Sequence, residues 1–228
     1  MKKLILTLLI ISVTAGLYAQ NAFFTTKKGA ELTYVQKDAR DKATSYSKIT
    51  IKDVKGSGRN MTISYVTEIL DKNRKPHKPP QEVSMTVVIK DDVVSMDMKD
   101  MFANMVSDPS IKVEFTGTPQ EIPANIKVGQ SIKNSEMTMT MDVSGMKITT
   151  VVKTTDVKCE AIEDITVPAG TFKCCRISET ITTVSMGNTT VTKVISWYAL
   201  GIGQVKSQSF DSRNNLLGST ELVEVKGN

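Results

Sequence analysis

The feature that most constrains this fold is a repeated alternation of apolar and polar residues. Apolar side chains recur at every second position in residues 61–65 and 137–143, and Ile177 and Ile181 share one phase. Because successive side chains of a β-strand point to opposite faces, a period of two indicates strands buried on one side. Turn-forming residues separate the runs: Gly56-Ser57-Gly58, Asp91-Asp92, Ser144-Gly145, Gly187-Asn188 and Asn214-Asn215. Short turns between consecutive strands favour antiparallel pairing, so the sequence predicts an all-β fold.

One segment has helical periodicity instead. Asp97 is a suitable N-cap, Pro109 ends the segment, and apolar residues between them recur at spacings of three and four: Met98, Met101, Phe102 and Met105. Such a stripe has to be buried on a sheet face. We therefore expect one short helix, which either plugs an open end of the sheet or covers it.

The first residues have the anatomy of a secretory signal peptide. Lys2 and Lys3 precede an apolar run that is too short to span a membrane comfortably, and small residues follow it. Cleavage is expected after Ala19, which makes residues 1–19 a signal peptide and residues 20–228 a single β-rich domain. There is no Cys near the cleavage site, so we do not expect a lipid-attached amino terminus. No later segment is long and apolar enough to span a membrane. The mature protein is thus expected to be soluble and periplasmic or secreted.

Residue types that catalysis commonly needs are scarce. The only His, His77, lies among prolines, and no Gly-rich phosphate loop or zinc-ligand spacing is present. We expect no enzymatic activity, no cofactor and no metal site. A basic stretch, Lys72 to Lys78, contains no interleaved aromatic residues, so we interpret it as a solvated loop and expect no nucleic-acid partner.

Methionine is the residue type most open to a functional interpretation. Met137, Met139 and Met141 share one face of a predicted strand, and Met101 and Met105 share the predicted helix stripe. Three interpretations remain: packing of an irregular core, a pliable pocket for an apolar ligand, and binding of a soft metal such as Cu(I). The core interpretation is the usual one for methionine, and no His supports the metal.

Trp197 is the only tryptophan, and Gly201 and Gly203 follow it closely. These glycines can adopt positive φ and thereby form a tight turn between two strands. Trp197 is then either an aromatic lip on a pocket or a buried anchor beside a hairpin.

Three cysteines follow the signal peptide. Export permits a disulfide, and Cys174 and Cys175 are adjacent, so on a strand they point to opposite faces. At most one of them meets Cys159 easily. We expect a Cys159–Cys174 disulfide, which requires a bulge or shift in the intervening hairpin, and Cys159–Cys175 is the alternative.

Several segments together resemble a known family. They are Phe24–Ala30, Ile122–Gln130, the sequence Val-Pro-Ala-Gly-Thr-Phe-Lys-Cys at Val167–Cys174, and Trp197-Tyr198 with Gly201 and Gly203. In this order they resemble the TapB-like family of exported bacterial proteins over nearly the whole mature chain. The resemblance implies a curved, half-open antiparallel sheet, or half-barrel, related to the lipoprotein carriers LolA and LolB, and it implies no catalytic residues. Members often carry a further Cys just before the segment that matches Val94–Met98, and this chain has none.

Two functions follow as hypotheses. The first is a non-enzymatic envelope protein that binds an apolar or lipid-like ligand in the half-open sheet. Its candidate lining residues are Met137, Met139, Met141, Met101, Met105 and Trp197. The second is a structural or interaction module with a filled core, whose partner is another envelope protein.

Overall fold

The computed structural model describes residues 22–97, 111–143 and 145–227. These residues form one sheet whose strands are β1 (Glu31–Asp38), β2 (Ala43–Ser57), β3 (Asn60–Leu70), β4 (Pro76–Lys90), β5 (Val93–Asp97), β6 (Ile111–Thr118), β7 (Glu121–Pro123), β8 (Ser135–Val143), β9 (Met146–Val167), β10 (Gly170–Ser185), β11 (Asn188–Ala199), β12 (Gly203–Phe210) and β13 (Leu216–Lys226). The predicted all-β fold is confirmed. The helix expected after Asp97 lies outside the described residues, and Asp97 itself is the last residue of β5.

All neighbouring strands pair antiparallel, in the order β6-β8-β9-β10-β11-β12-β13-β1-β2-β3-β4-β5-β7. The first strand, β1, therefore pairs with both the second strand, β2, and the last strand, β13. The other strands extend the sheet outward from these three on either side. The predicted turns at residues 91–92 and 214–215 lie between consecutive strands, as do Gly145 and Gly187, whereas Asn188 is already the first residue of β11. Short turns therefore connect consecutive antiparallel strands, as the sequence pattern predicts.

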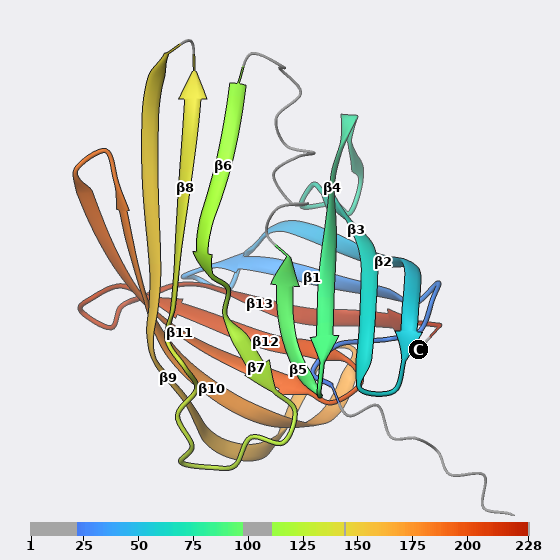
Figure 1. Cartoon of the computed structure of the whole chain (residues 1–228). Helices are drawn as coiled ribbons and strands as arrows, with labels where there is room; N and C mark the ends of the chain where they lie inside the picture. Colours follow the sequence, from blue (N-terminus) through green and yellow to red (C-terminus); the bar gives the residue numbers. More distant parts are fainter. Residues whose placement is uncertain (1–21, 98–110, 144, 228) are drawn as a thin grey trace, which may run out of the picture.

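The two edge strands, β6 and β7, are consecutive in the chain. Only Pro119 and Gln120 separate them, although β6 pairs with β8 at one edge and β7 pairs with β5 at the other. Two residues span only about 7 Å, so the two edges approach each other at this point. The sheet is consequently curled around an interior but not closed, since none of the described strand pairings joins β6 to β7 (Figure 1).

Bulges contribute to this curvature. Register shifts occur at Thr33/Tyr34 in β1, at Arg176/Ile177 and Ser178/Thr180 in β10, and at Trp197/Tyr198 in β11. An extra residue in one strand bends it and increases its local twist. The long hairpin of β9 and β10 coils enough for its tip to fold back on the sheet, where the Ala169 amide donates to the Leu222 carbonyl oxygen at 3.3 Å.

The basic stretch at 72–78 is not wholly a loop. The turn occupies residues 71–75, and Pro76 already belongs to β4. However, Leu70 pairs with Pro76 while Ile69 pairs with Gln81, so the residues between them bulge out of the ladder. The prolines are tolerated there because they need not donate to a neighbouring strand.

Candidate functional site

A cavity of about 650 Å³ lies inside the curled sheet. Strands from both halves contribute to it: Ile49 comes from β2, Met137 and Met139 from β8, and Gln204 from β12. Its volume falls in the range of about 300–1,000 Å³ that is typical of small-molecule pockets. The two sheet edges bring residues that are distant in sequence to the same wall, since Phe115 of β6 and Val94 of β5 both line it.

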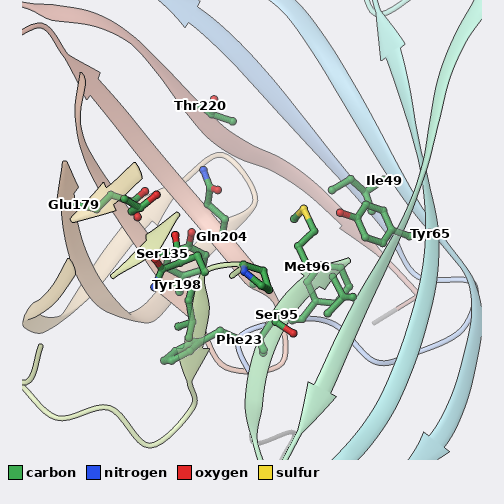
Figure 2. Close-up of a pocket in the computed structure, with 18 of the residues that line it drawn as sticks. Phe23, Ile49, Tyr65, Ser95, Met96, Ser135, Glu179, Tyr198, Gln204 and Thr220 are labelled. Carbon is green, nitrogen blue, oxygen red and sulfur yellow. The ribbon is translucent and has the colours of Figure 1, made fainter. Parts of the chain in front are cut away.

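Apolar side chains dominate the lining, and a smaller number of polar groups lie among them. Figure 2 shows Ile49 and Tyr65 on one side, and Glu179, Ser135 and Tyr198 on the other. Ser135 pairs in register with Thr154 of β9, and both are only 8% exposed. The interior therefore resembles a ligand site, in which a mostly apolar surface carries a few polar groups.

The segment before β1 forms part of this wall, which the sequence did not indicate. Phe23, Phe24 and Thr25 all line the cavity, and the Gly201 amide donates to the Ala22 carbonyl oxygen at 2.8 Å. The Phe23 ring lies 6.1 Å from that of Tyr198, between ring centroids, and the Phe24 ring lies 5.4 Å from that of Tyr65. The first described residues are thus packed into the interior.

Only some of the methionines that were predicted to share one face line the cavity. Met137 and Met139 are half-buried and line the cavity, together with Met96 of β5, which is 37% exposed. Met141 shares their phase but is not among the lining residues, because it lies farther along β8 toward its hairpin end. Met101 and Met105 lie outside the described residues.

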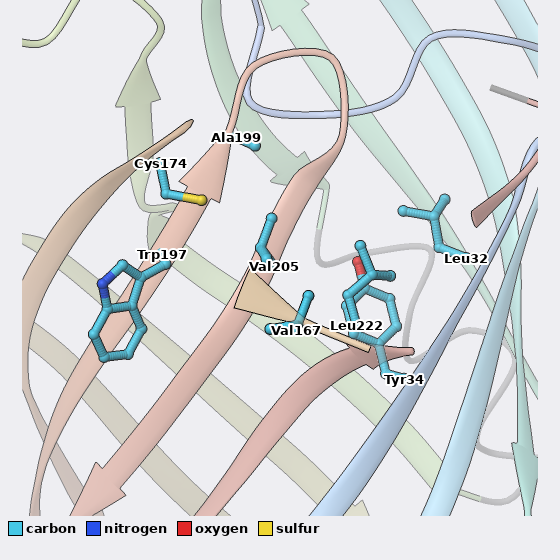
Figure 3. Packing of buried hydrophobic residues seen from close by; sticks show 8 residues of the cluster. All are labelled: Leu32, Tyr34, Val167, Cys174, Trp197, Ala199, Val205 and Leu222. Carbon is cyan, nitrogen blue, oxygen red and sulfur yellow. The ribbon is translucent and has the colours of Figure 1, made fainter. Parts of the chain in front are cut away.

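Trp197 is a buried anchor and does not line the cavity. It belongs to one buried cluster with Cys174 and Val167 (Figure 3). Its indole Nε1 donates to a carboxylate oxygen of Glu163 at 2.7 Å. The following residue, Tyr198, faces the cavity instead, as alternation along β11 requires.

Of the described residues on the cavity lining, Glu179 alone has a side chain that is ordinarily charged at neutral pH. Burial raises the pKa of its carboxyl group above the ordinary value. Within the described part of the chain, no hydrogen bond or ion pair to this side chain is found. Its charge in turn raises the pKa of the Tyr198 hydroxyl, though burial of that hydroxyl contributes more.

Gln120 lies where the chain steps from one sheet edge to the other. Its side-chain Nε2 donates to the carbonyl oxygens of Glu121 and Lys133, each at 3.2 Å. Its Oε1 is buried and accepts no hydrogen bond from any described residue. Because Gln120 also lines the cavity, the wall holds a polar acceptor in addition to the Glu179 carboxylate.

The cysteines are arranged differently from the expected pairing. The Sγ of Cys159 lies 2.7 Å from that of Cys175, and both side chains are buried in one cluster with Ile177. The Sγ of Cys174 instead lies 3.4 Å from the Phe172 carbonyl oxygen, in the cluster of Trp197. Burial, followed by the contact with Cys159, raises the pKa of the Cys175 thiol. The expected proximity of Cys159 and Cys174 is therefore replaced by that of Cys159 and Cys175.

Within residues 22–97, 111–143 and 145–227, no group of three or more His, Cys, Asp or Glu residues is placed to hold a metal ion. None of the described segments is a helix of the length and apolarity that crossing a membrane requires.

The fold and the cavity together define a class of protein: one with a curled antiparallel sheet that stays open between the edge strands β6 and β7 and surrounds a largely apolar cavity. A family model described as DUF3108-like matches residues 27–222, so the chain belongs to the DUF3108-like family. The narrower TapB-like resemblance is not confirmed. A search of curated proteins finds no match.

Two solved structures share the fold. One is a protein from Bacteroides fragilis NCTC 9343, described as exported and as having a YmcC-like fold, with a TM-score of 0.70 and 18% identity over 90% of this chain and 99% of that one. The other is described as a lipoprotein from Parabacteroides distasonis ATCC 8503, with the same score and identity over 90% of this chain and 98% of that one. At this identity the likeness shows the fold alone, and kinship with LolA and LolB stays a prediction.

Proposed function

We propose that this protein is a non-enzymatic, extracytoplasmic envelope protein that binds an apolar or lipid-like ligand inside its curled sheet. The observation that carries the proposal is the cavity of about 650 Å³ with its largely apolar lining. Apolar surface that faces an interior space becomes more stable when a ligand removes it from water, by about 25 cal/mol per Å².

Two independent features support an extracytoplasmic location. The first nineteen residues have the composition of a signal peptide, and the two solved structures of the same fold are described as an exported protein and a lipoprotein. Residues from position 22 onward are packed into the cavity wall, which is compatible with a mature chain that begins near Gln20.

The alternative of a structural module with a filled core is less well supported. It requires side chains to occupy the interior, whereas Met137 and Met139 border open space. The exposed large apolar residues, such as Met146, Met186 and Leu217, are distributed over different strands and turns. Scattered exposed apolar residues are normal and do not indicate an interface.

A matched pair of variants on β9 tests the proposal. Val152 lines the cavity, whereas its neighbour Val151 is not among the lining residues and lies on the opposite face of the strand. The mature protein would be titrated with an uncharged, environment-sensitive fluorescent probe, and decanol would then displace the probe. Val152→Trp, which places a bulky ring in the cavity, is expected to weaken probe binding about tenfold or more, while Val151→Trp retains it. Equal binding by both variants, or no binding by the wild type, would contradict the proposal.

A further inference from the structure

The described residues on the cavity lining carry charge of one sign. Among residues 22–97, 111–143 and 145–227, Glu179 is the one lining residue with a carboxylate, and none of those that line the cavity is Lys, Arg or His. The remaining polar lining groups are hydroxyls and amides, including those of Ser135, Thr154 and Gln204. An anionic ligand group would therefore meet no positive charge on this wall, whereas a cationic group would meet one negative charge.

Lys193 and Glu179 both border a second cavity, but no ion pair joins them among the described residues, and the register places them on opposite faces. On β11, Val194 pairs directly with Glu179, while Lys193 pairs with Thr180 and so points to the opposite face. Lys193 also donates to the Asn214 side-chain oxygen at 2.8 Å. On β9, the register shift opposite Glu179 contains Asp156, a second acid, whose φ is 56°. Neither neighbouring strand therefore neutralises the carboxylate.

Glu179 lies between two isoleucines, Ile177 and Ile181, on one face of β10. Ile177 lies on the same face two residues earlier and is 2% exposed, in the cluster of Cys159 and Cys175. A carboxylate on such a face is costly to ionise without a partner. Tyr198 pairs with Cys175, four residues before Glu179 on β10, and its side chain also lines the cavity. A carboxylate and an aromatic ring on one cavity lining are groups that suit an ammonium ligand.

We propose that the ligand of this cavity is a long-chain amphiphile with a protonated amine at its polar end, and that Glu179 binds this ammonium group. The inference rests on the proposed apolar-ligand function and specifies its ligand class. The alkyl chain contacts the methionine- and aromatic-lined wall, and the ammonium group donates to the Glu179 carboxylate. A fatty acid is disfavoured, because its carboxylate would lie beside a lining whose described residues carry only negative charge.

Three ligands of equal chain length separate the contributions. Decylamine, decanol and decanoate would be titrated at pH 7.5, where the amine is protonated and the acid is ionised. Wild-type protein is expected to bind decylamine about tenfold more tightly than decanol, and decanoate more weakly than either. Each ligand stays below its aggregation concentration, and displacement of the uncharged probe reports binding.

Glu179→Gln and Glu136→Gln provide the matched variants. Both remove one negative charge, but Glu136 lies on β8 next to Ser135, on the opposite face, where it pairs with Lys153 at 3.0 Å. Glu179→Gln is expected to reduce the advantage of decylamine over decanol to less than about threefold, and Glu136→Gln to preserve it. Circular dichroism verifies folding, and if Glu179→Gln does not fold, the wild-type ranking of the three ligands decides.

The outcomes distinguish the two proposals. If neither decanol nor decylamine binds the wild type, the apolar-ligand function itself is wrong. If decanol binds but decylamine and decanoate bind equally well, the cavity is a ligand site without a preference for amines, and only the assignment of Glu179 is overturned. If Glu136→Gln removes the preference as fully as Glu179→Gln, long-range charge rather than a contact in the cavity is responsible, which also overturns it.

Discussion

The Sγ atom of Cys159 lies 2.7 Å from the Sγ atom of Cys175, across the β9–β10 hairpin. At the hairpin turn, Gly170 pairs with Val167. If this register continued without a shift, Cys159 would lie opposite Ser178 and on the same face as Cys174. The shift at Arg176/Ile177 places Cys159 opposite Ile177 instead, on the face of Cys175. One bulge therefore determines which of two adjacent cysteines is the neighbour.

This relationship predicts a Cys159–Cys175 disulfide in the exported protein. Each thiol gives up one proton and one electron to a disulfide-bearing oxidant of the envelope, and the bond closes a loop worth on the order of 3 kcal/mol of stability. Peptide mapping without reduction should find the link in wild type and in Cys174→Ala. A link through Cys174, or three free thiols after oxidative export, would refute the pairing.

The position of Met139 predicts that Met139→Lys impairs binding more than folding. Met139 is half-buried beside the cavity, so a lysine stem has space to reach toward solvent. We expect a loss of about 1–2 kcal/mol in denaturant unfolding and at least about a tenfold loss in affinity for the uncharged probe.

Thr138→Lys is the control, because Thr138 lies on the same strand but on its other face. It should change neither quantity appreciably. If Met139→Lys does not fold at all, Met139 is a packed core residue. The part of the cavity wall formed by Met139 would then not be a ligand-binding surface.

Trp197→Phe should affect stability but not binding. The substitution removes the hydrogen bond from Nε1 to Glu163 and part of a buried cluster. Hydrogen bonds to charged groups contribute about 1.5–3 kcal/mol, so the unfolding free energy should fall by roughly this amount. Affinity for the probe should stay within about twofold. A large loss of affinity with unchanged stability would restore the interpretation of Trp197 as a pocket lip.

The raised pKa of Glu179 predicts how its contribution to stability varies with pH. Because burial raises the folded-state pKa above the ordinary value of 4.5, the contribution is fully present below pH 4.5 and is lost as pH rises through the folded-state pKa. Glu179→Gln, which stays neutral, should therefore be more stable than wild type at pH 7.5 and equally stable at pH 4.

Comparison of the two proteins at each pH cancels the other titrating groups. Among these, Asp211 has a lowered pKa because Asn215 hydrogen-bonds to it, so its contribution changes with pH in the opposite direction. A stability difference between Glu179→Gln and wild type that stays constant from pH 4 to pH 7.5 would contradict the burial of this carboxyl group.

Alternation in the sequence was enough to predict an all-β fold, antiparallel pairing and several of the turns. It could not predict depth along a strand, which is why Met141 shares a phase with Met139 without reaching the cavity. It could not locate bulges either, so the face of Cys159 was misassigned. One unused signal was present: Glu179 occupies the phase of Ile177 and Ile181, which marks a carboxylate on an apolar face. Closure of the interior by Phe23 and Phe24 depends on long-range packing that no local pattern encodes.

The central claim is that ligands bind inside the curled sheet. Methionine methyl groups report this directly, because Met96, Met137 and Met139 line the cavity, whereas Met146 and Met186 are 63% and 76% exposed. The measurement is a titration of decanol into protein labelled with ¹³C at the methionine methyls, followed by NMR. The account predicts saturable shifts of the Met96, Met137 and Met139 signals while those of Met146 and Met186 stay in place. Shifts confined to the exposed methyls, or no shifts at all, would contradict it.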